Sequence, residues 1–158
     1  MNYLDTEDNI VAIATAGGAG SVDIVRISGS CLEKLYKKLL SQNSTPKPNS
    51  IYQKNIYSLN SKKILDTCLV SYFKGPKSFT GDDVIEINTH GGGFTAQQIR
   101  NDIVDSGSAR LALPGEFMFR AYYNNKIDLV QAEGINELVK SDTRLQKENA
   151  LENINGKL

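Results

Sequence analysis

Short apolar runs and alternating apolar and polar residues fill most of the first 90 positions, a pattern typical of β-strands. The runs at residues 10–15 and 22–28 flank the glycine-containing segment AGGAGS, and they predict two strands around a flexible loop. Two further strands are expected at residues 51–59 and 64–73, with NSKK as the turn between them, and another at residues 83–89. The amino-terminal part is therefore expected to be rich in β-structure.

Two segments among these strands have helical spacing instead. In SCLEKLYKKLL, residues 30–40, apolar side chains recur every three or four positions, and Ser30 and Glu33 have the S-x-x-E spacing of a capping box. The second segment, TAQQIRNDIVDS at residues 95–106, follows a glycine-rich break, and Gly107 suits the left-handed conformation that ends many helices. Both segments are expected to be helices that accompany the strands.

The pattern after residue 107 becomes mainly helical. One more short strand is expected in SARLAL, residues 108–113, and Pro114 lies where a helix of two turns can begin. Asn124 and Asn125 tolerate left-handed geometry and are expected to end that helix. Asp128 then caps a long helix whose apolar stripe continues, less regularly, to the end of the chain.

These elements predict two structural parts. A chain of 158 residues suits one domain, or one domain with a fragment of another. An apolar helical stripe normally packs against partner helices, which the sequence after Asp128 does not supply. We therefore expect an α+β domain over residues 1–120 and the first helices of a truncated all-α domain over residues 121–158.

Charge is balanced over the whole chain but not along it. Lysine and arginine number 18, and aspartate and glutamate also number 18, so no net charge draws the chain toward nucleic acid or an acidic membrane. Between Lys34 and Lys63, however, seven lysines occur without an acidic residue. The simplest interpretation of this run is a solvated lysine-rich surface, and any contact with a polyanion has to be local.

Cysteine and histidine are too few and too scattered for a zinc site. Cys31 and Cys68 lie far apart, and His90 is the only histidine, so no dedicated metal site is expected. The first nine residues, MNYLDTEDN, lack the basic start and apolar run of a signal peptide, and no apolar stretch is long enough to span a membrane. These features predict a cytoplasmic protein with reduced thiols and no membrane association.

Nucleotide and hydrolase motifs are also missing. After Gly18 and Gly20 the chain has Asp23 where a dinucleotide-binding motif requires glycine, and no P-loop sequence occurs anywhere. We therefore expect this chain neither to bind nor to hydrolyse GTP. A single loop histidine such as His90 is more often a hydrogen-bonded structural residue than a catalytic base, so no hydrolase triad is proposed.

Two charged residues occupy unusual positions in expected strands. Glu86 lies between Ile85 and Ile87, so strand pleating directs it to the opposite face, where a carboxylate needs a matching donor. Arg26 lies between Val25 and Ile27 in the same way. Each could simply be an exposed strand residue, and each could equally belong to a binding site.

Three ordered blocks of sequence carry a resemblance to a known family. They are ATAGGAGSVDIVRISG at residues 14–29, PKSFTGDDVIEINTHGG at 76–92, and ARLALPGEFMFRAYYNNKIDLVQAEG at 109–134. From about Asn9 onward the chain closely resembles the amino-terminal part of the MnmE (TrmE) tRNA-modification GTPases. The last block is long and specific, and all three blocks have compatible spacings.

This resemblance implies an architecture and a function. Family members have a mixed-sheet, tetrahydrofolate-binding-like domain that also forms the homodimer, then a helical domain into which a GTPase domain is inserted. With the FAD-dependent partner MnmG (GidA), they modify carbon 5 of the wobble uridine of certain tRNAs, and the added carbon comes from a reduced folate such as 5-formyltetrahydrofolate. GTP hydrolysis, which depends on Mg²⁺ and K⁺, accompanies a conformational cycle. This chain would lack the GTPase domain.

The resemblance also implies three folate-contacting residues. The arginine of the I-x-R-x-S-G motif corresponds to Arg26, the glutamate of the D-V-x-E block to Glu86, and the lysine of the third block to Lys126. No catalytic or metal-binding residue is expected in this part. One departure concerns residues 16–18, Ala-Gly-Gly, where the family usually has Pro-Pro-Gly.

Two other functions remain open at this point. The chain could be a free-standing one-carbon-transfer enzyme that acts on a small amine, because an Arg26 and Glu86 pocket would serve that chemistry too. It could also be an oligomerisation module that has lost its ligand, because the altered glycine loop is more flexible. Folate titration distinguishes the oligomerisation module from the two folate-dependent functions.

Overall fold

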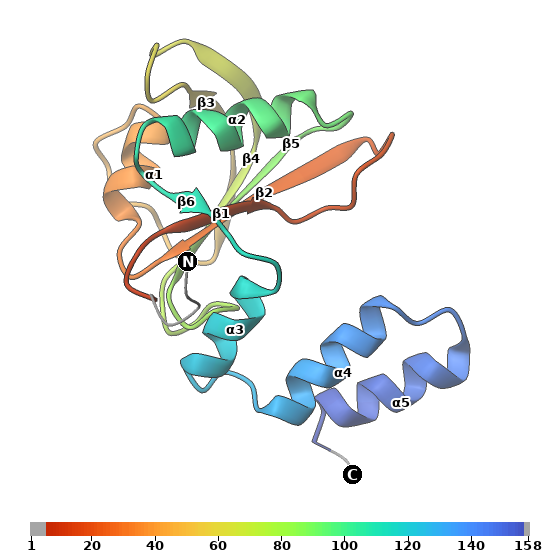
Figure 1. Ribbon diagram of the computed structural model, residues 1–158. Helices are drawn as coiled ribbons and strands as arrows, with labels where there is room; N and C mark the ends of the chain where they lie inside the picture. Colours follow the sequence, from red (N-terminus) through yellow and green to blue (C-terminus); the bar gives the residue numbers. More distant parts are fainter. Residues whose placement is uncertain (1–5, 157–158) are drawn as a thin grey trace.

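The protein is described here by a computed structural model that covers residues 6–156 (Figure 1). The strands in this part of the chain are β1 (Ile10–Ile13), β2 (Val22–Gly29), β3 (Ser50–Tyr57), β4 (Ile64–Phe73), β5 (Asp83–His90) and β6 (Arg110–Leu111). The helices are α1 (Glu33–Leu39), α2 (Phe94–Asp105), α3 (Glu116–Tyr123), α4 (Leu129–Val139) and α5 (Arg144–Ile154). The expected α+β class is confirmed.

One mixed sheet organises the amino-terminal part. Its strand order is β3-β4-β5-β2-β1-β6, with antiparallel neighbours except for β1 and β6, which run parallel. Because β6 pairs with β1 rather than with a strand near it in sequence, the chain after α2 returns to the sheet edge beside its own amino-terminal segment (Figure 1). This return brings α3 into contact with Asp8, which precedes β1.

Helices α1 and α2 cover one face of the sheet, whereas the other face, which we call the open face, is covered only in part, by the loop before β5 and by α3. The covered face carries alternate strand residues such as Val25, Ile27, Ile85 and Ile87, which are fully buried beneath α1 and α2. The helices contribute Leu35, Tyr36, Leu39, Ala96, Ile99 and Ile103 to this core. On the opposite face, Ile51 is 64% exposed and Leu69 is 46% exposed. The sequence alternation at Glu86 and Arg26 therefore places both side chains on the open face.

The prediction that Ser30 and Glu33 form a capping box at the start of α1 is wrong. The helix begins at Glu33 with Leu32 at the cap position, and no side chain caps it. Instead, the backbone N–H of Leu32 donates to the buried carboxylate of Asp83, at 3.1 Å. Glu33 forms an ion pair with Lys37 and accepts a hydrogen bond from Thr45. A distant carboxylate on β5 therefore fills the role that local spacing assigned to Ser30.

The single long helix expected after Asp128 is also wrong. Asp128 does cap α4 through a capping box with Gln131, but α4 ends at Val139 and Thr143 begins a second helix with its own capping box. The two helices pack together as a hairpin, and a Cβ on Gly134 would lie 3.1 Å from the carbonyl oxygen of Ala150. The segment thus supplies part of the partner surface that its apolar stripe requires.

Smaller differences concern element ends. The strand expected at residues 108–113 is only two residues long, because Glu116 accepts the backbone N–H of Leu113 and draws the chain away from the sheet edge. Asn125 has the expected left-handed conformation, with a φ of 56°. The expected boundary between residues 120 and 121 lies within α3, which connects the sheet to the α4–α5 hairpin (Figure 1).

Two expectations concern location in the cell. Across residues 6–156, each helix is too short or too polar to cross a bilayer. The segment assessed for a signal peptide begins with residues 1–5, which lie outside the described residues.

Candidate functional site

Arg26 and Glu86 face each other across two central strands. They are direct partners in the antiparallel register of β2 and β5, and Arg26 Nε lies 2.9 Å from Glu86 Oε1. Their side chains are 27% and 23% exposed. The donor that Glu86 requires on the open face is therefore Arg26. Within residues 6–156, Glu86 Oε2 and the two terminal nitrogens of Arg26 have no hydrogen-bond partner and are available to a ligand.

Two phenylalanine rings contact the same arginine. The Arg26 guanidinium carbon lies 5.5 Å from the ring centre of Phe79 and 5.8 Å from that of Phe117, within the range of cation–π contacts. Phe79 belongs to the loop before β5, and Phe117 to the first turn of α3. Sequence reasoning assigned no binding role to either ring, although both lie inside the three sequence blocks quoted above. Their convergence on Arg26 was detectable only from the tertiary structure.

Lys126 lies near the same loop but not in the pair itself. The chain at Gly81 passes so close that an added Cβ would lie 2.8 Å from Asn124 Cβ and 3.1 Å from Lys126 Cγ. Asn124 also donates to the carbonyl of Thr80 at 2.8 Å. The Lys126 side chain is exposed. The structure thus brings Arg26 and Glu86 into contact and places the exposed Lys126 beside Gly81, which lies two positions after Phe79 in the loop.

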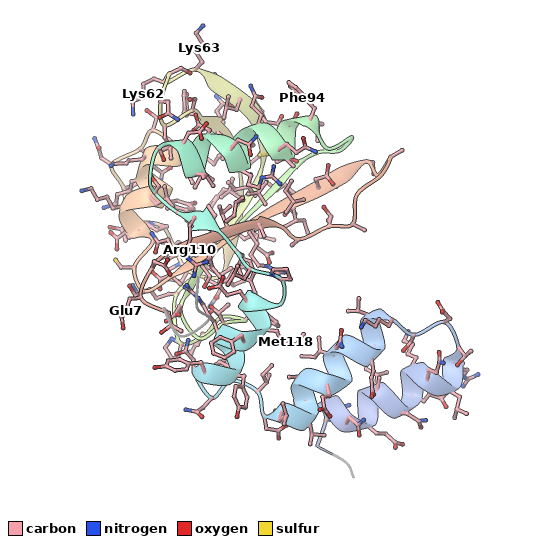
Figure 2. The ribbon with its side chains drawn as sticks, viewed as in Figure 1. Glu7, Lys62, Lys63, Phe94, Arg110 and Met118 are labelled. Carbon is pink, nitrogen blue, oxygen red and sulfur yellow. The ribbon has the colours of Figure 1, made fainter. Side chains whose placement is uncertain are left out.

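A buried ion-pair network fixes α3 at the sheet edge. Glu116 and Arg120 are both fully buried, and Glu116 accepts two hydrogen bonds from Arg110, at 2.8 and 2.6 Å. Arg120 donates to the carbonyl and to the carboxylate of Asp8, at 2.6 and 2.8 Å. Figure 2 shows Arg110 where the edge of the sheet meets α3. Because Phe117 belongs to α3, this network positions one of the two rings against Arg26.

Asp83 ties the loop of Phe79 to the core. Its buried carboxylate accepts hydrogen bonds from the backbone N–H groups of Gly75 and Leu32 and from the Tyr72 hydroxyl, at 3.0, 3.1 and 2.8 Å. Burial alone would raise the pKa of Asp83, but these hydrogen bonds together outweigh it and hold that pKa below its usual value. The ionised carboxylate is therefore part of the folded structure.

Substitution of Asp83 by asparagine is expected to make the protein less stable at neutral pH. The asparagine amide has an NH₂ group in place of one of the oxygens that accept hydrogen bonds from Tyr72, Leu32 and Gly75. We therefore expect the free energy of unfolding to fall by about 1.5 kcal/mol at pH 7. The pKa of Asp83 is lower in the folded than in the unfolded protein. The ionised carboxylate therefore contributes its full stabilisation above the unfolded pKa of about 4, and this stabilisation declines as the pH falls below that value.

Urea denaturation of both proteins at several pH values measures this effect. The difference in unfolding free energy is expected to narrow steadily below about pH 4. A difference that stays constant down to pH 2 would show that the carboxylate charge contributes nothing.

The Arg26–Glu86 pair lines none of five prominent hollows among residues 6–156, whose walls are formed by other side chains. The glycine loop also gives no cover, since a Cβ added at Gly17 or Gly18 would meet nothing within 4 Å. The pair therefore lies on an open sheet face that a second surface could complete.

The arrangement is suited to binding rather than to hydrolysis. It offers an acceptor, several guanidinium donors and two aromatic rings within a small area, which fits a flat, polar heterocycle. His90 is hydrogen-bonded to Asp66 at 2.8 Å, as expected for a structural histidine. In residues 6–156, no group of three or more potential metal ligands occurs.

Comparison with known proteins identifies similar sequences. A family model described as the GTP-binding protein TrmE N-terminus matches residues 9–126. This range contains Arg26, Glu86, Lys126 and both phenylalanines of the site.

Relatives in several bacteria share the same name, tRNA modification GTPase MnmE. The protein of Campylobacter curvus is 47% identical over 135 residues, which is 85% of this chain and 30% of the relative. That of Aliarcobacter butzleri is 45% identical over 134 residues, covering 85% of this chain and 29% of the relative. The Orientia tsutsugamushi protein is 39% identical over 153 residues, or 97% and 34%. The chain thus spans about a third of the length of these relatives.

Proposed function

The chain belongs to the TrmE amino-terminal family, and from this premise we propose that it is the reduced-folate-binding and dimerising part of a tRNA-modification GTPase. The observation that carries the proposal is the Arg26–Glu86 pair, held on the open sheet face with unpaired hydrogen-bonding atoms and contacted by Phe79 and Phe117. An ion pair with these properties is unusual on a plain strand surface, where exposed charges normally point into water.

The proposed ligand is 5-formyltetrahydrofolate or another reduced folate. Its pterin ring presents a ring N–H and an amino group side by side, and a carboxylate such as Glu86 accepts such a donor pair in a bidentate manner. Arg26 and Lys126 are the cations available for the ring carbonyl and the anionic glutamate tail. When bound, the folate supplies the one-carbon unit, while the residues of this chain bind and orient it.

We also propose that the chain forms a homodimer through the β-rich domain. The open face carries exposed apolar side chains, among them Val22, Ile51 and Leu69, on the same side of the sheet as Arg26 and Glu86. Covering these side chains would remove apolar surface from water and would enclose the ion pair. Light scattering that gives the monomer mass at high micromolar concentration would contradict this part of the proposal.

The remaining functions belong to the whole protein rather than to this chain. We propose that the full-length enzyme is a cytoplasmic GTPase that uses Mg²⁺ and K⁺ and assembles with the FAD-dependent MnmG (GidA). The complex would modify carbon 5 of the wobble uridine of tRNA. Residues 1–120 would form the folate domain and residues 121–158 the start of the helical domain. The sequence printed here contains no P-loop, so GTP hydrolysis would reside elsewhere in the protein.

Titration calorimetry with 5-formyltetrahydrofolate tests the proposal directly. We expect saturable binding with one folate per chain, because the Arg26–Glu86 pair and the two rings recur in each copy. A fluorescent GTP analogue added under the same conditions is expected not to bind. Absence of folate binding, together with a stable dimer, would instead favour a ligand-free oligomerisation module, which the exposed apolar face alone would also support.

A further inference from the structure

Two adjoining hollows lie beside α1 and the strand β3, on the helix-covered side of the sheet. Their volumes are about 470 and 140 Å³, and Gln42 lines both. Lysines dominate their walls: Lys34, Lys37, Lys38 and Lys62 line the first, and Lys47 and Lys54 line the second. No aspartate or glutamate lines either hollow. We call these six lysines and the two hollows the lysine groove.

The lysine groove concentrates positive charge that the rest of the chain lacks. Residues 34–63 contain seven lysines and no acidic residue, which leaves eleven basic and eighteen acidic residues for the remainder of the chain. The groove collects six of the seven lysines, and Glu33 beside it pairs with Lys37, so the local charge is positive although the net charge of the chain is zero.

Most of these lysines are free to contact an anion. Lys37 is paired with Glu33 at 3.0 Å, and Lys62 donates to the carbonyl of Leu59 at 3.1 Å. Across residues 6–156, by contrast, Lys34 and Lys38 form no ion pair, and both are exposed. Figure 2 shows Lys62 and its neighbour Lys63 extending outward at the turn between β3 and β4. Several ammonium groups therefore point to solvent without an internal counter-ion.

Tyrosine rings lie among the lysines. Tyr52 lines the second hollow, is 39% exposed and lies 5.7 Å from the Lys54 ammonium group. Tyr57 lines the first hollow and is partly exposed. A basic groove with exposed aromatic rings is the combination by which proteins hold single-stranded nucleic acid, since lysines contact phosphates and rings stack on bases.

We propose that the lysine groove binds the phosphate backbone of single-stranded RNA, with Tyr52 and Tyr57 as stacking surfaces. This inference rests on the proposed function, in which the whole protein acts on tRNA. The groove lies on the opposite side of the sheet from Arg26 and Glu86, so RNA and folate can be bound at the same time. Its ligand is chosen by backbone charge and by unstacked bases rather than by sequence.

Fluorescence anisotropy with a fluorescein-labelled, uridine-rich single-stranded RNA tests the inference on the full chain. The variant Lys34→Glu/Lys38→Glu reverses two exposed charges of the groove, and Lys140→Glu/Lys147→Glu makes the same change in net charge on the α4–α5 hairpin. We expect the groove variant to bind RNA about tenfold more weakly at low salt, while the hairpin variant changes less than about twofold.

Salt dependence provides a second readout. A plot of the logarithm of the RNA association constant against the logarithm of the salt concentration has a negative slope. Loss of two phosphate contacts should make this slope less negative by roughly 1.4, in the groove variant only. Equal losses of affinity in both double variants would overturn the inference, because the binding would then reflect net charge alone. Absence of RNA binding by the unmodified chain would overturn it as well.

Calorimetry with 5-formyltetrahydrofolate on the same proteins separates this inference from the proposed function. Both double variants are expected to bind folate as the unmodified chain does, which also shows that they are folded. Folate binding without RNA binding would overturn the inference that the lysine groove binds RNA, and it would still support the proposed folate site. RNA binding without folate binding would overturn the folate site and support the groove.

Discussion

Replacement of Glu116 by alanine is expected to lower the free energy of unfolding by about 3 kcal/mol, because it leaves the buried Arg120 and the partly buried Arg110 to share the carboxylate of Asp8. Glu116 and Arg120 are fully buried, and Glu116 also accepts two hydrogen bonds from Arg110 and one from the backbone of Leu113. Burial alone would raise the pKa of Glu116, but the hydrogen bonds from Arg110 and Leu113 hold it below its usual value. The carboxylate is thus charged in the folded protein.

The chain provides a matched control for this substitution. Glu148 also lies four residues from an arginine, but the Arg144 and Glu148 side chains are 92% and 54% exposed. Glu148→Ala is expected to change the unfolding free energy by less than about 0.5 kcal/mol, because exposed ion pairs contribute little. Urea denaturation of the three proteins gives the comparison. Similar small losses for both variants would contradict the role assigned to the Glu116 network.

Substitution of Glu86 by alanine is expected to weaken 5-formyltetrahydrofolate binding by about 30-fold or more, since it removes the bidentate acceptor proposed for the pterin edge. The fold should persist, because Glu86 and Arg26 are both partly exposed and Arg26 can then be hydrated. Light scattering is expected to give the same mass for the variant and the unmodified protein.

Two further variants make the Glu86 result specific. Glu133→Ala removes an exposed carboxylate on α4 and should leave folate affinity unchanged. Lys126→Ala should weaken binding less than Glu86→Ala does, because an exposed ammonium group such as that of Lys126 would contribute little to holding a partly solvated ligand tail. Equal affinities for the unmodified protein and Glu86→Ala would place the pterin elsewhere, and the oligomerisation-module hypothesis would then be favoured.

Local sequence patterns predicted the strands better than the helix ends. The strand at residues 64–73 has the expected bounds, and the alternation around Glu86 correctly assigned its face. The predicted start of α1 was wrong because the side chain that binds its first turn is Asp83, which lies 51 positions after Leu32 in the chain. Capping by a distant residue leaves no local signal, whereas Ser30 and Glu33 provided a misleading one.

The break between α4 and α5 was missed for a different reason. Thr143 and Gln146 have the T-x-x-Q spacing of a capping box, so a signal for the second helix was present in the sequence. No glycine or proline interrupts residues 140–143, and the continuing apolar residues suggested one helix. Phe79 and Phe117 illustrate a third limit, because their convergence depends on how α3 returns to the sheet and not on any spacing along the chain.

The position of Asp8 determines when folding of this domain can finish. Its partners Arg110 and Arg120 lie 102 and 112 positions further along the chain. During synthesis at the ribosome, the antiparallel pairs β2–β5 and β3–β4 have all their residues before these arginines emerge, while the outer edge of β1 has no partner until β6 is made. Until then the nascent chain exposes an unpaired strand edge, which is a surface for aggregation or chaperone binding. Closing so long a loop costs chain entropy, and the ion pairs that Asp8 forms with Arg110 and Arg120 hold the two ends of the loop together.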